Sequence, residues 1–106
     1  MRNHAVSGIE KQIAYWRKSS RGDLRVANLL LARRKTRHGL FFLHLATEKL
    51  LKALVCKATG QPAPRIHALP ALAQRAGVAL SPAQWECLAG LTGSTSRGAI
   101  RMTSRP

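Results

Sequence analysis

The sequence has few acidic side chains. Asp and Glu together number 4, against 18 Lys and Arg, so the formal net charge of the 106 residues is +14. Such an imbalance favours an anionic partner, which would be nucleic acid, a nucleotide, an acidic protein or an anionic membrane. A GC-rich genome that encodes arginine often would also raise the charge. The charge therefore narrows the class of partner without identifying a function.

Cysteines and long apolar runs are also scarce. Cys56 and Cys87 stand outside any CxxC pair, and the N-terminal MRNHAVSGIEKQ lacks the apolar segment of a secretion signal. We therefore expect a cytoplasmic protein whose two reduced thiols pack as small apolar groups. The longest uncharged apolar run, residues 39–47, is far shorter than the roughly 20 residues that span a bilayer. The sequence predicts no membrane segment, no metal and no cofactor.

No segment alternates as a β-strand does, and no internal repeat is present. Apolar residues make up 45% of the chain, too many for a disordered protein. The pattern that is present is helical. A helix is predicted over residues 8–35, because one face is formed by residues spaced three or four apart: Ile9, Ile13, Trp16, Ser20, Leu24, Ala27 and Leu31. A kink is expected near Gly22.

The rest of the chain predicts three further helices. Gly39 is interpreted as a turn residue, and residues 40–58 have the broad apolar face of a central bundle helix. Residues 59–67 read as a loop and residues 67–76 as a short helix that Gly77 ends. A last helix starts at Pro82 and runs to about residue 90 or 92, because Ser81 and Gln84 form a capping box. The predicted fold class is all-α, with antiparallel helices.

The stretches SSRGDLRVANLLL, GLFFLHLATEKLLKALV and PAPRIHALPALAQRAGV, taken together, resemble the HEPN family of small helical domains. The most specific part is A-x-E-K-x-x-K-A at residues 46–53, followed by P-x-x-H-x-L at residues 64–69. The resemblance covers about residues 16–91. The positions that carry it are Asp23, Leu24, Ala27, Phe42, Leu45, Ala46, Glu48, Lys49, Leu51, Lys52, Ala53, Pro64, His67 and Leu69.

The resemblance implies an up-and-down bundle of four to five helices that often forms a homodimer. It also implies a nucleotidyltransferase-type protein partner, in a toxin–antitoxin-like pair, and a nucleotide or RNA ligand. Some family members are metal-independent ribonucleases with an R-x(4–6)-H motif in the C-terminal part of the bundle, and many small members end near Arg-Tyr-Pro. After Leu91 this sequence has neither feature.

We therefore divide the chain into a HEPN-like domain over residues 1–92 and a disordered or aberrant basic tail over residues 93–106. A shifted reading frame would explain the loss of apolar periodicity near Thr92, and translating the gene in all three frames would test it. A binding and interaction module is the preferred function. The alternatives are a ribonuclease toxin and a truncated, non-functional family member.

Two Arg/His pairs are candidate catalytic residues. Arg33 and His38 have R-x4-H spacing, and Arg37 and His44 have R-x6-H spacing. A histidine can transfer a proton near neutral pH, while an arginine stabilises the charge of a phosphorane. Both pairs lie at the junction of the first two predicted helices, away from the position of the family motif. The alternative interpretation is a solvated cationic helix end.

The same segment is the predicted binding surface for phosphates, through Arg33, Arg34, Lys35, Arg37 and His38. Cations at the C-terminus of the first helix would also complement its dipole, so part of the cluster needs no functional reason. No aromatic residue is interleaved with these cations, which weakens an interpretation as a stacking site for single-stranded RNA.

A partly buried polar network is predicted for Glu48, Lys49, Lys52 and His67, where it would fix helix register or a dimer contact. His44 and Glu48 are spaced i,i+4, so they share a helix face. A metal would need a third ligand, which is not evident, and a hydrogen-bonded pair is preferred. His67 is expected to cap the third helix or bond back to the second, with phosphate binding or proton transfer as the alternative.

Overall fold

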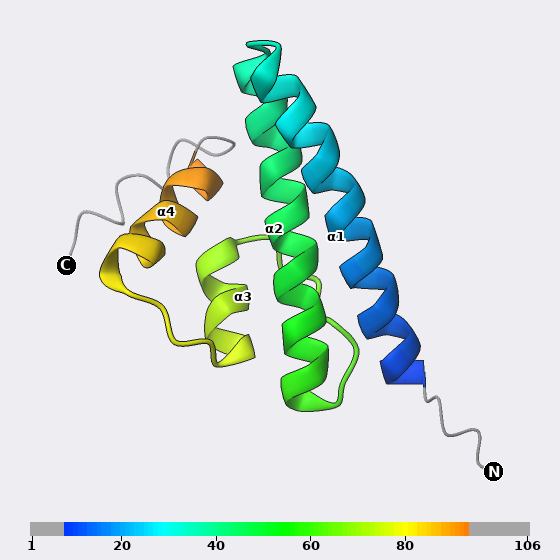
Figure 1. Cartoon of the computed structure of the whole chain (residues 1–106). Coiled ribbons are helices and arrows are strands. Elements are labelled where there is room, and N and C mark those ends of the chain that lie inside the picture. Colours follow the sequence, from blue (N-terminus) through cyan, green and yellow to red (C-terminus); the bar gives the residue numbers. More distant parts are fainter. Residues whose placement is uncertain (1–7, 94–106) are drawn as a thin grey trace.

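The computed structural model describes residues 8–93, which form four α-helices and no strand. Helices α1 (Gly8–Ala32) and α2 (Thr36–Thr59) lie side by side as an antiparallel hairpin, and α3 (Leu69–Ala76) and α4 (Pro82–Gly93) lie on the other side of α2 (Figure 1). This confirms the predicted all-α helical bundle. Residues 94–106, nearly all of the predicted tail, lie outside the described residues. Within the described part, no helix combines the length and apolar character needed to span a bilayer.

The two long helices approach closely because small residues line their contact. Ala27 of α1 and Ala46 and Ala53 of α2 are almost fully buried. The Ser20 hydroxyl, also buried, donates a 2.6 Å hydrogen bond to the carbonyl oxygen of Ala46. This bond satisfies a polar group inside the interface and ties the two helices in one register.

The connection between α1 and α2 corrects two predictions. Helix α1 is continuous through Gly22, without a break, and it ends at Ala32 rather than at residue 35. Arg34 then adopts a left-handed conformation, with φ of 63°. Its amide donates to the Leu31 carbonyl at 3.0 Å, and the Lys35 amide donates to the Leu30 carbonyl at 2.8 Å. These two bonds form a Schellman cap, so the turn occupies residues 33–35.

Gly39 is therefore not the turn residue that the sequence predicts, because it lies inside α2. It is buried, and a Cβ built at this position would lie 2.6 Å from Cδ2 of Leu31. A glycine is needed here because the helices pass too closely for a side chain. The prediction is wrong because this glycine is required by the close packing of two helices and not by a turn.

The apolar core lies between α2 and α3. Its buried members are Leu51, Val55, Leu69, Leu72 and Ala73, and α4 adds the half-buried Trp85, Leu88 and Leu91. The predicted capping box is present: the Gln84 amide donates to Ser81 Oγ at 3.2 Å, and the Ser81 amide donates to Gln84 Oε1 at 2.9 Å. Helix α3 begins at Leu69 rather than at residue 67, and Ala68 is its N-cap residue without a side-chain bond.

Candidate functional site

A buried carboxylate, that of Glu48, is the centre of a polar network in the middle of α2. Glu48 Oε2 lies 3.1 Å from Lys52 Nζ and 2.8 Å from His67 Nδ1, and Oε1 lies 3.5 Å from His44 Nε2. Glu48, His44 and Lys52 are each at most 8% exposed. Three nitrogens from α2 and from the loop before α3 thus converge on one carboxylate.

Helical geometry explains three members of this network. His44, Glu48 and Lys52 are spaced i, i+4 and i+8, so they form a row along one face of α2. The same face carries Leu51 and Val55, which pack against α3. Burying a charged row beside an apolar core is costly unless the charges pair, and here the acid and the base are adjacent on the same helix.

The fourth member, His67, joins through the tertiary fold. The loop that follows α2 returns along the helix and brings His67 back to Glu48, across 19 positions of sequence. His67 therefore bonds back to the second helix, which was one of its two predicted roles, and it does not cap α3. Its side chain is 76% exposed, whereas that of Glu48 is only 10% exposed. A buried carboxylate thus orients an imidazole whose outer edge faces solvent, an arrangement that can hold a proton-transfer group.

The electrostatic balance of the network appears in the pKa of Glu48. Burial by itself raises this pKa, because it disfavours the charged carboxylate. The hydrogen bonds from His67 and Lys52, together with their positive charge, outweigh burial and hold the pKa of Glu48 below its ordinary value. The carboxylate is therefore ionised near neutral pH and acts as the fixed negative centre of the site.

Trp16 links the network to α1. Lys52 Nζ lies 5.3 Å from the centre of the Trp16 ring, which is within the range of a cation–π contact. Lys49 takes a different direction from the one predicted. Its Nζ lies 2.7 Å from Asp23 Oδ2 and donates to Ser19 Oγ at 2.8 Å, so Lys49 forms a second polar contact between α1 and α2.

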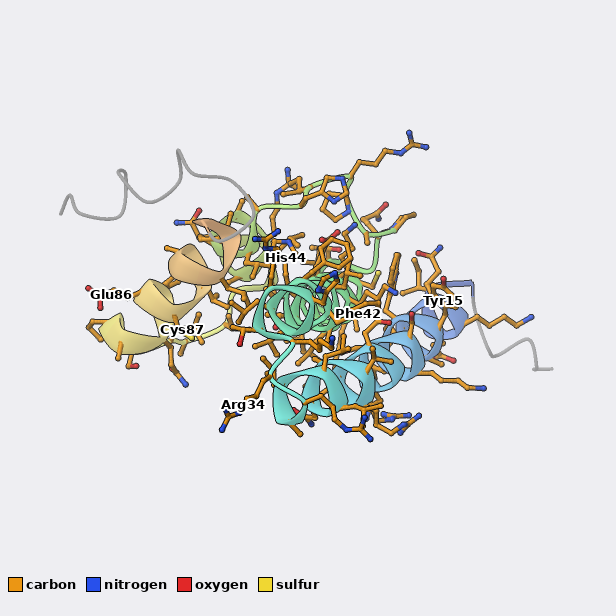
Figure 2. The ribbon with its side chains drawn as sticks, turned by 90° about the horizontal axis from the view of Figure 1, so that it is seen from above. Tyr15, Arg34, Phe42, His44, Glu86 and Cys87 are labelled. Carbon is orange, nitrogen blue, oxygen red and sulfur yellow. The ribbon has the colours of Figure 1, made fainter. Side chains whose placement is uncertain are left out.

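The predicted phosphate-binding residues gather at the end of the α1–α2 hairpin. We call Arg33, Arg34, Lys35, Arg37 and His38 the hairpin tip, and all five are exposed. Figure 2 places Arg34 at the edge of the bundle and His44 near its middle. Arg37 and His38 belong to the first turn of α2, not to the end of α1. The predicted complement to the dipole of the first helix is therefore wrong for these two residues.

The candidate catalytic pairs are distributed over two environments. Arg33 and His38 both lie at the exposed tip. Arg37 and His44 are separated by seven positions of continuous helix, about 10 Å along its axis at 1.5 Å per residue. The Nε2 atom of His44 faces Glu48 inside the bundle. The structure therefore brings His44 to the buried carboxylate rather than to Arg37.

A comparison with protein-family models finds the HEPN domain over residues 13–94. The chain belongs to the HEPN family. The match extends from the second turn of α1 through α4, so it contains both the Glu48 network and the hairpin tip. Searches of curated proteins and of solved structures found no significant match.

The HEPN domain also contains features that sequence reasoning missed. Cys56 is buried as expected, but Cys87 is exposed on α4, where it lines a shallow apolar hollow together with Leu51 of α2. On α1, the side chain of Tyr15 is 61% exposed although aromatic residues are usually buried. The sequence pattern does indicate the exposure of Tyr15, because this residue lies outside the apolar face that predicts α1.

Proposed function

We propose that this HEPN domain is a binding module that contacts a nucleotide or RNA through the hairpin tip. It would work as a homodimer with a nucleotidyltransferase-type protein, in a toxin–antitoxin-like pair. The observation that carries the ligand part is the gathering of Arg33, Arg34, Lys35, Arg37 and His38 at one exposed end. Such a cluster attracts phosphates and binds them through charge-assisted hydrogen bonds.

Local helix stability does not account for all of the charge at the tip. Arg37 and His38 lie in the first turn of α2, where the helix dipole disfavours cations. Arg34 is in the left-handed region, which costs a residue with a side chain about 1–2 kcal/mol relative to its ordinary conformation. Backbone strain at an exposed basic residue is consistent with a functional role, because folding alone favours glycine there.

The protein-partner part is supported by an apolar surface on the hairpin. Leu24 and Leu50 are 41% and 46% exposed, and a groove of about 310 Å³ between α1 and α2 is lined by Ile13, Arg17, Leu50, Ala53, Leu54 and Lys57. Apolar residues that line a groove with a charged rim are typical of protein interfaces.

The ligand part is tested by measuring RNA binding at low salt with the full chain and a triple variant, Arg33→Gln, Arg34→Gln and Arg37→Gln. The matched control removes the same charge from exposed residues elsewhere, by Lys57→Gln, Arg65→Gln and Arg75→Gln. We expect the tip variant to bind at least tenfold more weakly than the control variant. Equal binding by the two variants would refute a role for the tip.

The partner part is tested by co-expressing the chain with any nucleotidyltransferase encoded by a neighbouring gene and measuring complex mass. Replacing Leu50 with Lys should release the partner, and a chain that remains alone at all concentrations would contradict the proposal. Incubation with total RNA in EDTA separates binding from catalysis. Cleavage that His38→Ala or His44→Ala abolishes would favour the ribonuclease alternative.

A further inference from the structure

The solvent face of α1 carries a second cationic surface that is separate from the hairpin tip. Residues on this face recur at intervals of three or four, and we call them the α1 stripe: Lys11, Tyr15, Lys18, Gly22, Arg25 and Leu29. All of them are exposed except Gly22, which is half-buried. The opposite face of α1, with Ser20 and Ala27, is buried against α2. The stripe is therefore a part of α1 that does not pack in the bundle.

The charge of the stripe is regular. Lys11, Lys18 and Arg25 follow each other at seven-residue intervals, about 10 Å apart along the helix axis. Glu10 directly precedes Lys11, and the carboxylate of Asp23, which lies between Lys18 and Arg25 in the sequence, is paired with Lys49 at 2.7 Å. A row of cations along a straight helix matches an extended polyanion better than it matches a single small anion.

An ordered aromatic ring lies between the first two cations. Tyr15 is 61% exposed, and its ring packs edge-to-face on Trp16 with centroids 5.1 Å apart. Trp16 in turn makes the cation–π contact with Lys52 of α2. Figure 2 shows Tyr15 on the side of the bundle away from Cys87 and α4. The ring of Tyr15 is thus held in place while one side remains open to solvent.

Beside this ring is an open hollow. It has a volume of about 490 Å³ and is lined by Tyr15, Lys18, Ser19, Gly22, Asp23 and Arg25. Gly22 creates the space, because a Cβ built there would meet no atom within 4 Å. The hollow therefore combines an aromatic face, two cations and the room for a planar group.

We propose that the α1 stripe binds single-stranded nucleic acid, with one base stacked on Tyr15 over Gly22 and the phosphates paired with Lys11, Lys18 and Arg25. Proteins that bind single strands combine a cationic track with exposed aromatic rings, and the stripe has both. A membrane surface would need an apolar helix face, whereas the stripe carries three cations and only one aliphatic side chain, that of Leu29. The inference rests on the proposed function in taking nucleic acid as the ligand, but it assigns different residues.

The test is fluorescence anisotropy of the full chain with a labelled single-stranded RNA of about 12 nucleotides, a length suited to one small domain. Tyr15→Ala should weaken binding by roughly five- to 100-fold, the loss of one base stack, whereas Tyr15→Phe should bind as the wild type does. Gly22→Leu should fill the hollow and weaken binding, although leucine favours the helix. Circular dichroism of each variant verifies the fold.

Charge is tested with Lys18→Gln and Arg25→Gln together, against Arg65→Gln and Arg75→Gln as the matched control. Each phosphate contact removed should lower the slope of log affinity against log salt by about 0.7. A duplex of the same sequence should bind more weakly, because its bases are already stacked. Equal affinity for the duplex or for anionic vesicles would overturn the proposal, as would wild-type binding by Tyr15→Ala or Gly22→Leu.

The two binding proposals fail in different ways. If the hairpin-tip variant loses RNA and the stripe variants keep it, the inference about α1 is wrong and the proposed function stands. If the stripe variants lose RNA and the tip variant keeps it, the single strand lies on α1 and the tip is not its binding site. A wild-type chain that binds no RNA at low salt would overturn both.

Discussion

The middle of α2 and the hairpin tip are both rich in charge, but opposite physical conditions apply to them. In the middle, Lys52 is 8% exposed and lies 3.1 Å from Glu48 Oε2. At the tip, Arg33, Arg34 and Lys35 are exposed to solvent. A buried cation needs a partner, whereas an exposed cation is stabilised by water.

This difference explains where the acidic residues are placed. Of the 4 Asp and Glu in the chain, Glu48 pairs with Lys52 inside the bundle, and Asp23 of α1 pairs with Lys49 of α2. The positive charge inside the bundle is therefore compensated, and the net charge of +14 belongs mainly to the surface. The net charge therefore says little about function until the buried, paired charges are separated from the exposed ones.

The largest effect should follow from removing the buried carboxylate. Glu48→Ala leaves Lys52 buried without its acid, and we expect the free energy of unfolding to fall by about 3–5 kcal/mol. Urea denaturation followed by far-UV circular dichroism measures the change. The control, Glu86→Ala, removes an exposed carboxylate on α4 and should change stability by less than about 0.5 kcal/mol.

A second variant sharpens this result. Adding Lys52→Met to Glu48→Ala removes the unpaired buried charge, so part of the lost stability should return. If the double variant is no more stable than Glu48→Ala, the loss arises from the cavity or from His67 rather than from the charge of Lys52.

The next effect is on the pH dependence of stability. The pKa of Glu48 is lower in the folded chain than in the unfolded chain, with His67, Lys52 and His44 facing the carboxylate. The network should therefore stabilise the fold fully above the ordinary glutamate pKa of about 4.3, and this contribution should be lost as the pH falls through the folded pKa. Urea midpoints measured from about pH 6 to about pH 3 should fall more steeply for the wild type than for Glu48→Gln.

A smaller effect separates two glycines that look alike in sequence. Gly39→Ala places a Cβ 2.6 Å from Leu31 Cδ2, so we expect a loss of about 1–2 kcal/mol despite the better helix propensity of alanine. Gly22→Ala meets no atom within 4 Å and should gain up to about 1 kcal/mol. Thermal unfolding of both variants tests the opposite signs. Stabilisation by both would show that α1 and α2 separate easily at Leu31.

The sequence predicts those parts of the fold that depend on local patterns. The capping box of Ser81 and Gln84 is present, and Glu48 and Lys52, which the sequence places in one polar network, lie 3.1 Å apart. The prediction of the first turn is wrong because it rests on glycine as the turn residue. In the structure the left-handed residue of this turn is Arg34. Gly39 is required instead because Leu31 packs against its Cα. Such a requirement arises only when two distant segments meet.

The candidate site divides in the same way. His67 meets Glu48 because the loop after α2 returns along the helix. No local sequence pattern predicts the path of that loop. Lys49 follows Glu48 directly, but successive residues point about 100° apart around a helix at 3.6 residues per turn. Lys49 therefore faces Asp23 of α1 while Lys52 faces Glu48. Neighbours in sequence belong to different networks because the helix turns between them.

The smallest stability effect concerns the tip itself. Helices α2 and α3 end on left-handed glycines, Gly60 and Gly77, whereas α1 ends on Arg34 with φ of 63°. Arg34→Gly should therefore raise the free energy of unfolding by about 1 kcal/mol, because glycine relieves the strained backbone. It should also weaken RNA binding, because a cation is lost. Arg33→Gly removes the same charge next to the strained position and should give no gain in stability. A stabilised Arg34→Gly chain with unchanged RNA affinity would show that the strain at the tip serves no ligand.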